Sequence, residues 1–211
     1  MGETKNNISL IYRKVWLYRL IMNLLYKGGY NRRFDVVIKY IDLEKGDKVA
    51  EFCFGDTHIA KYCYKNGVDW VGYDFNPNFI RYAKQNAFNA YFIDLLNPSS
   101  FSQIIYSNDR VDVAIMMGSL YHFHDNIGQL IHQIMAYCNK FVISEPVGSL
   151  SNLSGPIGWL AKRSANAGHG NEAFRYDTNT LLLELEGLCR ERYKLTILEV
   201  KRDLICQIEW K

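Results

Sequence analysis

A short apolar strand that runs directly into a tight turn and a helix constrains the fold of this chain more than any other feature. The strand pattern ends at Phe52, the turn contains Gly55, and helical spacing begins at Thr57. A second short strand, Trp70–Tyr73, ends on Asp74, about 20 residues after the turn, where a carboxylate can hold the ribose of a bound nucleotide. The turn carries one glycine where a dinucleotide fold normally has three. The pattern therefore predicts a nucleoside-containing cofactor without specifying which one.

Size and charge limit the classes of protein that this chain can belong to. At 211 residues, 48% of them apolar, the chain suits one α/β domain with a sizeable core. A net charge of +3 is too small to indicate nucleic-acid binding. The five cysteines are scattered and form no C-x-x-C pair, so they predict neither a zinc site nor a disulfide framework. We expect a cytoplasmic protein without a metal centre.

The N-terminal segment has an amphipathic character that leaves several roles open. Apolar positions recur at helical spacing from Ile8 to Lys27, and basic residues interrupt them, so neither a signal peptide nor a membrane span is expected. Basic residues combined with Trp16 and Tyr18 are typical of helices that lie on membrane surfaces. The same helix could instead cover the cofactor cleft or form a dimer contact.

Strand and helix patterns alternate along most of the chain, which favours right-handed βαβ units and a doubly wound, mostly parallel sheet with helices on both faces. We expect strands at 49–52, 70–73, 91–93, 111–116 and 141–144, and helices at 32–41, 57–66, 78–86, 101–106 and 127–138. Residues 1–45 are expected to form a helical extension, and residues 46–211 the main domain.

The C-terminal segment departs from this alternation. After a helix at 178–188, the strand patterns 194–200 and 204–210 are separated only by residues 201–203. That gap is too short for a helical crossover, so the two strands should form an antiparallel hairpin. Ordinary dinucleotide-binding domains continue in parallel, and the hairpin therefore argues against a nicotinamide-dependent oxidoreductase.

With these elements in order, residues 46–211 resemble the class I S-adenosylmethionine-dependent methyltransferases. The resemblance implies a seven-stranded Rossmann-like methyltransferase fold and S-adenosylmethionine as cofactor. It is carried by the segments Glu51–Thr57, Gly72–Pro77, Phe92–Leu95, Val111–His122 and Phe141–Pro146. In the first segment Cys53 and Thr57 occupy positions where the family has glycine, and only Gly55 is retained.

The chemistry of this cofactor accommodates the missing glycines. S-adenosylmethionine has no phosphate, so fewer backbone positions must lack a side chain than in a dinucleotide site. Its cationic sulfonium suits acidic and aromatic neighbours, and residues 49–60 contain no Lys or Arg. The alternative is a structural turn in an enzyme that has lost its cofactor.

The resemblance implies roles for individual residues around the turn. Asp74 should accept hydrogen bonds from both ribose hydroxyls, although it could instead cap the next helix. Asp94 should contact the adenine amino group or serve only as a surface turn carboxylate. Glu51 should lie near the methionine amino group or only stabilise the turn. The full set expected to bind the cofactor is Glu51, Phe52, Cys53, Phe54, Gly55, Asp74, Phe75, Asp94, Leu95, Gly118 and Ser119.

The segment Gly118–Asp125 follows the fourth strand at its carboxyl end, where open α/β sheets bind their ligands. We predict Tyr121, His122 and His124 as the catalytic residues. In an extended loop the two histidines would point the same way, and either could act as a general base. The segment could instead form a wall for the cofactor and leave deprotonation to solvent.

Residues 145–176 are irregular and rich in Gly and Ser, which favours a lid or a binding loop. His169, Arg175 and Tyr176 gather at its end and are expected to bind the substrate. Together with Lys162 and Arg163, Arg175 could hold a phosphate or carboxylate. A solvated loop with one structural salt bridge is the competing interpretation.

These observations predict an enzyme that transfers a methyl group to an oxygen or nitrogen atom of a small-molecule acceptor. The basic lid and the apolar N-terminal helix suggest an anionic, glycan-linked or lipid-linked acceptor, with no nucleic-acid partner. A catalytically silent scaffold of the same fold and a nicotinamide-dependent oxidoreductase remain as alternatives.

Overall fold

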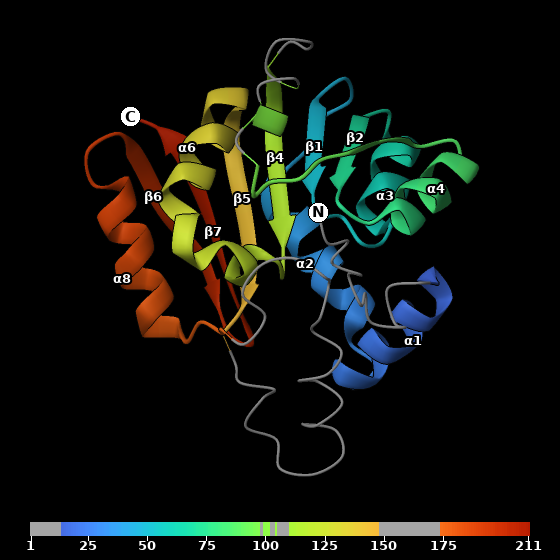
Figure 1. Ribbon diagram of the computed structural model, residues 1–211, viewed down its shortest axis with the longest axis horizontal. Coiled ribbons are helices and arrows are strands. Elements are labelled where there is room, and N and C mark those ends of the chain that lie inside the picture. The colour runs from blue at the N-terminus through green and yellow to red at the C-terminus, as the bar shows by residue number, and fades with distance from the viewer. Residues whose placement is uncertain (1–13, 98, 102–103, 105–109, 148–173) are drawn as a thin grey trace, which may run out of the picture.

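The protein folds around one mixed seven-stranded sheet (Figure 1). The computed structural model describes residues 14–97, 99–101, 104, 110–147 and 174–211. The strand order is β3-β2-β1-β4-β5-β7-β6. The strands are β1 (Lys48–Phe52), β2 (Asp69–Asp74), β3 (Asn89–Phe92), β4 (Val111–Met117), β5 (Cys138–Pro146), β6 (Tyr193–Val200) and β7 (Asp203–Trp210).

The sheet has the predicted topology. The first five strands pair in parallel, whereas β7 pairs antiparallel with both β5 and β6. This confirms the antiparallel hairpin and the Rossmann-like methyltransferase architecture. The chain moves outward in one direction from β1 to β3 and in the other from β4 to β6, after which β7 returns between β5 and β6. The strand order therefore reverses between β1 and β4, and ligands bind at the carboxyl ends of the strands beside such a switch point.

Helices cover both faces of the sheet, as the near-continuous apolar strands require. In β4, Ala114 and Met116 face one core, and Val113 and Ile115 face the other, because successive side chains of a strand alternate between faces. The helices whose bounds fall within the described residues are α1 (Val15–Leu25), α2 (Tyr30–Ile41), α3 (His58–Asn66), α4 (Pro77–Gln85), α6 (Ile127–Tyr137), α8 (Thr178–Cys189) and the 3-10 helix η2 (Leu120–Asn126).

The two cores have different helical partners. The first core contains residues of η2, α6 and α8, and the second contains residues of α1, α2, α3 and α4. In Figure 1 α1 and α2 lie below the carboxyl ends of the strands, on the edge where the switch point opens. Buried side chains of α2, including Phe34, Val37 and Ile41, pack in the second core together with Val49 of β1. α2 thus packs on one face of the sheet, and α1 packs against α2 and α4.

Element boundaries agree closely with the sequence predictions. The clearest difference is β5, which extends beyond the expected 141–144 at both ends because it pairs with both β4 and β7. β3 begins two residues before the expected position 91. Most of the helix expected at 101–106 lies outside the described residues.

Candidate active site

The turn after β1 has a backbone conformation that suits glycine. Cys53 and Gly55 have φ angles of +54° and +52°, in the left-handed region that L side chains rarely adopt. The Cys53 amide donates a hydrogen bond to the Tyr73 carbonyl at 2.7 Å, which ties the turn to β2. Cys53 therefore occupies a glycine-like position despite its side chain, because the surrounding structure fixes the backbone there.

Asp74 connects the end of β2 to this turn. Its carboxylate accepts hydrogen bonds from the Gly55 amide at 3.0 Å and from the Asn76 amide at 2.7 Å. Burial raises the pKa of Asp74 from 3.8 to about 6, although the backbone hydrogen bonds oppose this shift. The cap of α4 is Asn76, whose side chain accepts from the Asn78 amide. Asp74 is thus not needed as the cap of α4, and its carboxylate lies at the end of β2 beside the turn after β1.

Acidic residues surround the turn, which suits a cationic ligand. Glu51 is buried and accepts a hydrogen bond from the Trp70 indole at 2.9 Å. Burial raises the pKa of Glu51 well above its usual range, and the carboxylates of Asp56 and Asp74 raise it further. Such mutual effects show that the three carboxylates share one electrostatic environment. A sulfonium ion fits this environment, whereas a pyrophosphate would be repelled.

Several residues expected to bind the cofactor are instead part of the protein's own packing. The Phe52 ring is fully buried and stacks on Tyr73 at 5.3 Å, and Phe54 packs edge-on against Trp70 at 5.5 Å. These two phenylalanines can offer a ligand only their backbone. Asp94 accepts a hydrogen bond from the Leu96 amide at 3.0 Å, as a turn carboxylate does. Phe52 and Phe54 are both buried, so their rings are not exposed to a ligand.

The remaining cofactor positions are divided between the two sides of the switch point. The Phe75 ring lies 5.4 Å from that of Phe92, beside the end of β3, and Leu95 is buried in the first core. Across the switch point Gly118 has a φ of +63°, and its amide donates to the Ser144 carbonyl at 2.7 Å. Burial raises the pKa of the partly exposed Cys53 thiol and the neighbouring Ser119 opposes this shift, so the loops after β1 and β4 lie beside each other.

The N-terminal helix α1 contacts the turn directly, which sequence reasoning allowed but did not assign to residues. The Arg19 guanidinium forms a two-pronged ion pair with Asp56, with its Nε at 2.9 Å from Oδ2 and its Nη2 at 2.5 Å from Oδ1. The Tyr18 hydroxyl lies against Gly55, 3.2 Å from the position that a Cβ would take there. The Arg19–Asp56 pair thereby holds α1 over the turn. The two residues are 37 positions apart, so helical periodicity could not predict their contact.

A second arginine, whose side chain is buried, supports the loop after β4. Arg33 of α2 donates to Asp203 of β7 at 2.8 Å and to the Ser144 carbonyl at 3.3 Å. A Cβ at Gly118 would overlap the Arg33 guanidinium, so this position needs glycine for steric reasons as well as for its φ angle. The contact joins residues separated by 170 positions, and sequence reasoning did not find it.

Glu145 at the end of β5 fixes the start of η2. Its buried carboxylate accepts a hydrogen bond from the Leu120 amide at 2.9 Å. Burial raises the pKa of Glu145 from 4.5 to about 8, with Leu120 and Arg33 acting against the shift. A carboxylate at a helix N-terminus also interacts favourably with the exposed amides there.

Residues 118–125 do not form an extended loop, the conformation in which His122 and His124 would point the same way. Residues 120–126 form the 3-10 helix η2, in which residues two apart point in different directions. The His122 ring lies 3.9 Å from the Tyr121 ring, whereas His124 stacks on Phe174 at 4.0 Å. The two histidines therefore occupy two different aromatic contacts.

Five of the six predicted catalytic and substrate-binding residues nevertheless come together. The Arg175 guanidinium lies over the Tyr121 ring at 3.9 Å, and Tyr176 meets Phe174 edge-on at 4.7 Å. Burial, and secondarily the charge of Arg175, lowers the pKa of His122 from 6.5 to about 4. The imidazole is therefore neutral at pH 7, and its Nδ1 is buried without a hydrogen-bond partner among the described residues.

Two further expectations fall partly or wholly outside the described residues. His169, Lys162 and Arg163 lie there, as does most of the expected lid at 145–176. In the part of the chain that the structure describes, no group of His, Cys, Asp and Glu side chains is arranged to hold a metal ion.

Comparisons with known proteins agree with this geometry. The sequence model of the family described as "Methyltransferase domain" matches residues 26–185. An uncharacterized methyltransferase from Synechocystis sp. is 23% identical over 152 residues, which cover 71% of this chain and 68% of that protein.

Two solved structures show how widely the fold is shared. A plantazolicin methyltransferase, in complex with a monoazolic desmethylPZN analog and SAH, has a TM-score of 0.64 at 15% identity, covering 92% of this chain and 90% of its own. A chain described as a putative Zn-dependent alcohol dehydrogenase from Rhodobacter sphaeroides has a TM-score of 0.63 at 13% identity. The match covers 97% of this chain and 99% of that chain. At such identities a likeness shows the fold and not the activity.

The left-handed backbone at Cys53 generates a first prediction. Replacing Cys53 with Gly should change the free energy of unfolding by less than about 1 kcal/mol, because relief of the backbone strain offsets the lost packing. Replacing it with Val should cost about 2 kcal/mol or more, because a β-branched side chain is poorly tolerated at positive φ. Urea unfolding of both variants measures the difference. Equal stabilities for the Gly and Val variants would contradict the strained conformation.

The raised pKa of Glu145 predicts how stability changes with pH. Because the folded state holds this proton more tightly than the unfolded chain, the resulting stabilisation is lost as pH rises through about 8. The wild type should lose about 2 kcal/mol more than the Glu145→Gln variant between pH 6.5 and 8.5. The amide oxygen can still accept from Leu120, so the loop is retained. Identical pH slopes in urea unfolding would contradict the assignment.

Proposed function

This chain belongs to the family of methyltransferase domains, and we propose that it transfers the methyl group of S-adenosylmethionine to an oxygen or nitrogen atom of a small anionic acceptor. S-adenosylmethionine is the cofactor of such enzymes, and it supplies an electrophilic methyl group when bound. The observation that carries the choice of acceptor is the position of Arg175 over Tyr121, beside a neutral His122.

The carboxyl ends of β1 and β2 provide the residues that would hold the cofactor. The Asp74 carboxylate lies at the end of β2 and would accept hydrogen bonds from the ribose hydroxyls, as the family resemblance implies. Glu51 and Asp56 lie close enough to interact electrostatically, and their negative potential favours a cationic sulfonium. The ion pair with Arg19 offsets the charge of Asp56, and Arg33 pairs with Asp203, so the remaining negative potential at the turn comes mainly from Asp74.

The acceptor would bind on the other side of the switch point, between η2 and the start of α8. A guanidinium matches the geometry of a carboxylate or phosphate and binds either through paired hydrogen bonds. Arg175 already donates to the Phe174 carbonyl at 2.5 Å, and its stacking on Tyr121 fixes the plane of the guanidinium. An anionic group of the acceptor held there would place a neighbouring hydroxyl or amine beside His122.

His122 is the better candidate for a general base among the two histidines. The low pKa of His122 keeps its imidazole unprotonated throughout the physiological range, so a lone pair is available to accept a proton. The same low pKa makes His122 a weaker base than a typical histidine. His124 stacks on Phe174 and lies 3.2 Å from Asp125, which suits a role in positioning the aromatic residues. The Tyr121 ring contacts both the Arg175 guanidinium and the His122 imidazole and would line the acceptor site.

The exposed apolar residues of α1 bear on the kind of molecule that carries the acceptor group. We favour an anionic group on a lipid-linked or glycan-linked molecule, because the exposed apolar residues of α1 lie on the same edge of the sheet as the switch point (Figure 1).

Removing the Arg175 guanidinium tests the proposed acceptor site. Methyl transfer from labelled S-adenosylmethionine would be measured with a panel of alcohols, phenols and amines that carry a carboxylate or phosphate. For an acceptor that the wild type methylates, Arg175→Gln should lower kcat/KM about 10- to 150-fold, as expected for a lost charge-assisted contact. Affinity for S-adenosylmethionine, measured by calorimetry, should stay unchanged.

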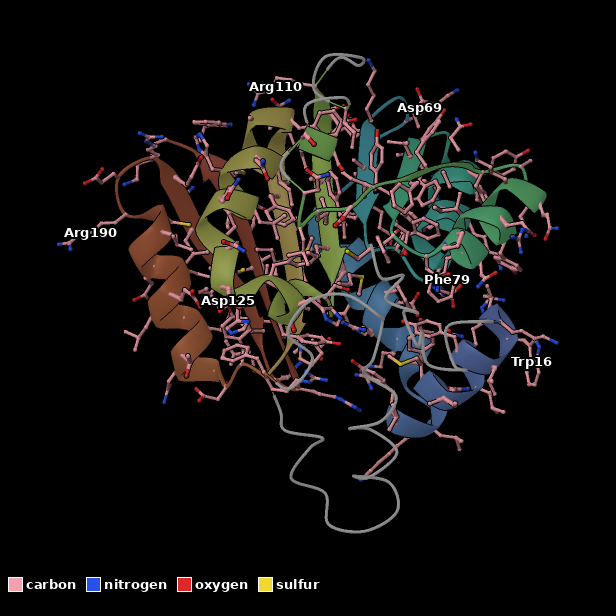
Figure 2. All side chains as sticks on the ribbon, in the orientation of Figure 1. Trp16, Asp69, Phe79, Arg110, Asp125 and Arg190 are labelled. Atoms are coloured by element: carbon pink, nitrogen blue, oxygen red, sulfur yellow. The ribbon has the colours of Figure 1, made fainter. Side chains whose placement is uncertain are left out.

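Arg190→Gln provides the matched control, because Arg190 is an exposed arginine that follows α8 at the opposite end of that helix (Figure 2). It should leave kcat/KM unchanged. If the wild type binds S-adenosylmethionine but methylates no acceptor of the panel, a silent scaffold is favoured. Methylation of uncharged acceptors with equal efficiency in the Arg175 variant would contradict the anionic site.

A further inference from the structure

Helix α1 presents an apolar surface to solvent, on the side opposite to its packed face. Trp16, Leu20 and Leu24 recur every four residues, and their exposed fractions are 62%, 51% and 65%. Residues so spaced lie on one face of a helix. We refer to these three side chains as the α1 stripe. Figure 2 shows Trp16 projecting from the outer side of α1, away from the sheet.

The inner face of α1 is fully engaged with the domain. Val15 and Leu25 are buried, and Tyr18 packs edge-on against Phe79 of α4 at 5.1 Å. The Arg19 guanidinium is held by Asp56 and by the Tyr82 hydroxyl at 3.1 Å. The orientation of α1 is therefore fixed by contacts on one side of the helix. With these contacts in place, the α1 stripe faces outward.

The charges in the segment that contains the α1 stripe are all of one sign. Residues 4–34 contain no Asp or Glu. Their basic residues are Lys5, Arg13, Lys14, Arg19, Lys27, Arg32 and Arg33. Arg19 and Arg33 point inward to carboxylates, whereas Lys14 and Lys27, at the two ends of α1, are exposed. The α1 segment thus combines exposed apolar side chains with two exposed lysines that form no ion pair among the described residues.

We propose that the α1 stripe docks the protein on an anionic lipid surface, with α1 lying in the plane of the interface. Leucines can enter the boundary between headgroups and acyl chains, a tryptophan is favoured at that depth, and flanking lysines reach anionic headgroups. Among the described residues, no helix is long and apolar enough to cross a bilayer, so α1 would lie on the membrane. The proposal does not depend on which acceptor is methylated.

A second copy of this chain fits the α1 stripe less well. From Trp16 to Leu24 the stripe is about 12 Å long, at 1.5 Å per helical residue, and one helix wide. This is far smaller than the roughly 800 Å² per partner that a stable interface buries. Two copies that paired through α1 would also bring their Lys14 and Lys27 side chains together without a facing carboxylate from this segment. An anionic surface complements the charge, whereas another copy repeats it.

Docking through α1 would place the membrane beside the cofactor turn. The residues that hold α1 against the turn, Tyr18 and Arg19, lie on the same short helix as the α1 stripe. The carboxyl ends of the strands lie on this edge of the molecule (Figure 1). An acceptor that resides in the lipid surface would then reach the enzyme from the side on which the switch point opens.

Vesicle flotation with a matched pair of variants tests the proposal. The full chain would be mixed with vesicles of phosphatidylcholine alone or with one quarter phosphatidylglycerol, at low and at high salt. The wild type should float with the anionic vesicles, and the bound fraction should fall at high salt because exposed charges are screened. Leu24→Glu should reduce the partition coefficient about tenfold or more, because a buried apolar contact becomes a charge that anionic lipid repels.

Leu183→Glu is the control, since Leu183 is a 71% exposed leucine on α8 and the variant has the same net charge. It should float as the wild type does. Circular dichroism and calorimetric binding of S-adenosylmethionine verify that both variants are folded. Failure of the wild type to bind anionic vesicles would overturn the proposal, and so would equal loss of binding in both variants. A dimer in sedimentation velocity that Leu24→Glu dissociates would identify a second copy as the partner instead.

Discussion

The hydrogen bonds from the Gly55 and Asn76 amides to Asp74 are the contacts on which the rest of the site depends. They join the end of β2 to the turn after β1, and they are buried where few water molecules can compete. With the turn held in this way, Cys53 and Gly55 keep their left-handed conformations, and Glu51 and Asp56 face the same space. One carboxylate thus organises the backbone at the edge of the sheet where the proposed cofactor would bind.

Two arginines, the half-buried Arg19 and the buried Arg33, extend this organisation to the N-terminal helices. Arg19 connects α1 to the turn after β1 through Asp56, and Arg33 connects α2 to β5 and β7 through Ser144 and Asp203. Each guanidinium is placed against a carboxylate, since an unpaired charge would be costly at such burial. The N-terminal helices are therefore fastened at both sides of the switch point, where ligands of this fold bind.

Local patterns in the sequence predicted the fold well, because the signals needed for it are local. Alternating strand and helix periodicity located nearly every element, and the short gap at residues 201–203 determined the antiparallel hairpin. The resemblance likewise located Asp74, Gly55 and Gly118 at the carboxyl ends of neighbouring strands. These positions follow from the order of elements alone.

The details of the site depend on contacts between distant segments, which no local pattern carries. The 3-10 helix η2 replaces the expected extended loop because Glu145, from the next strand, binds the Leu120 amide. Phe52 and Phe54 were expected at the cofactor but are buried in the two cores, since burial depends on what packs above each strand. Arg33 could have been noticed only as a basic residue on the otherwise buried side of its helix.

The most direct measurement of the central claim is the affinity for S-adenosylmethionine as a function of pH. The Asp74 pKa of about 6 in the free protein should fall when ribose hydroxyls bind, because only the carboxylate can accept from both. Calorimetric affinity should therefore rise up to about tenfold per pH unit below pH 6 and level off above pH 7, and Asp74→Asn should remove this dependence. Affinity that does not vary between pH 5 and 7 in the wild type, or binding of NAD in place of S-adenosylmethionine, would contradict the account.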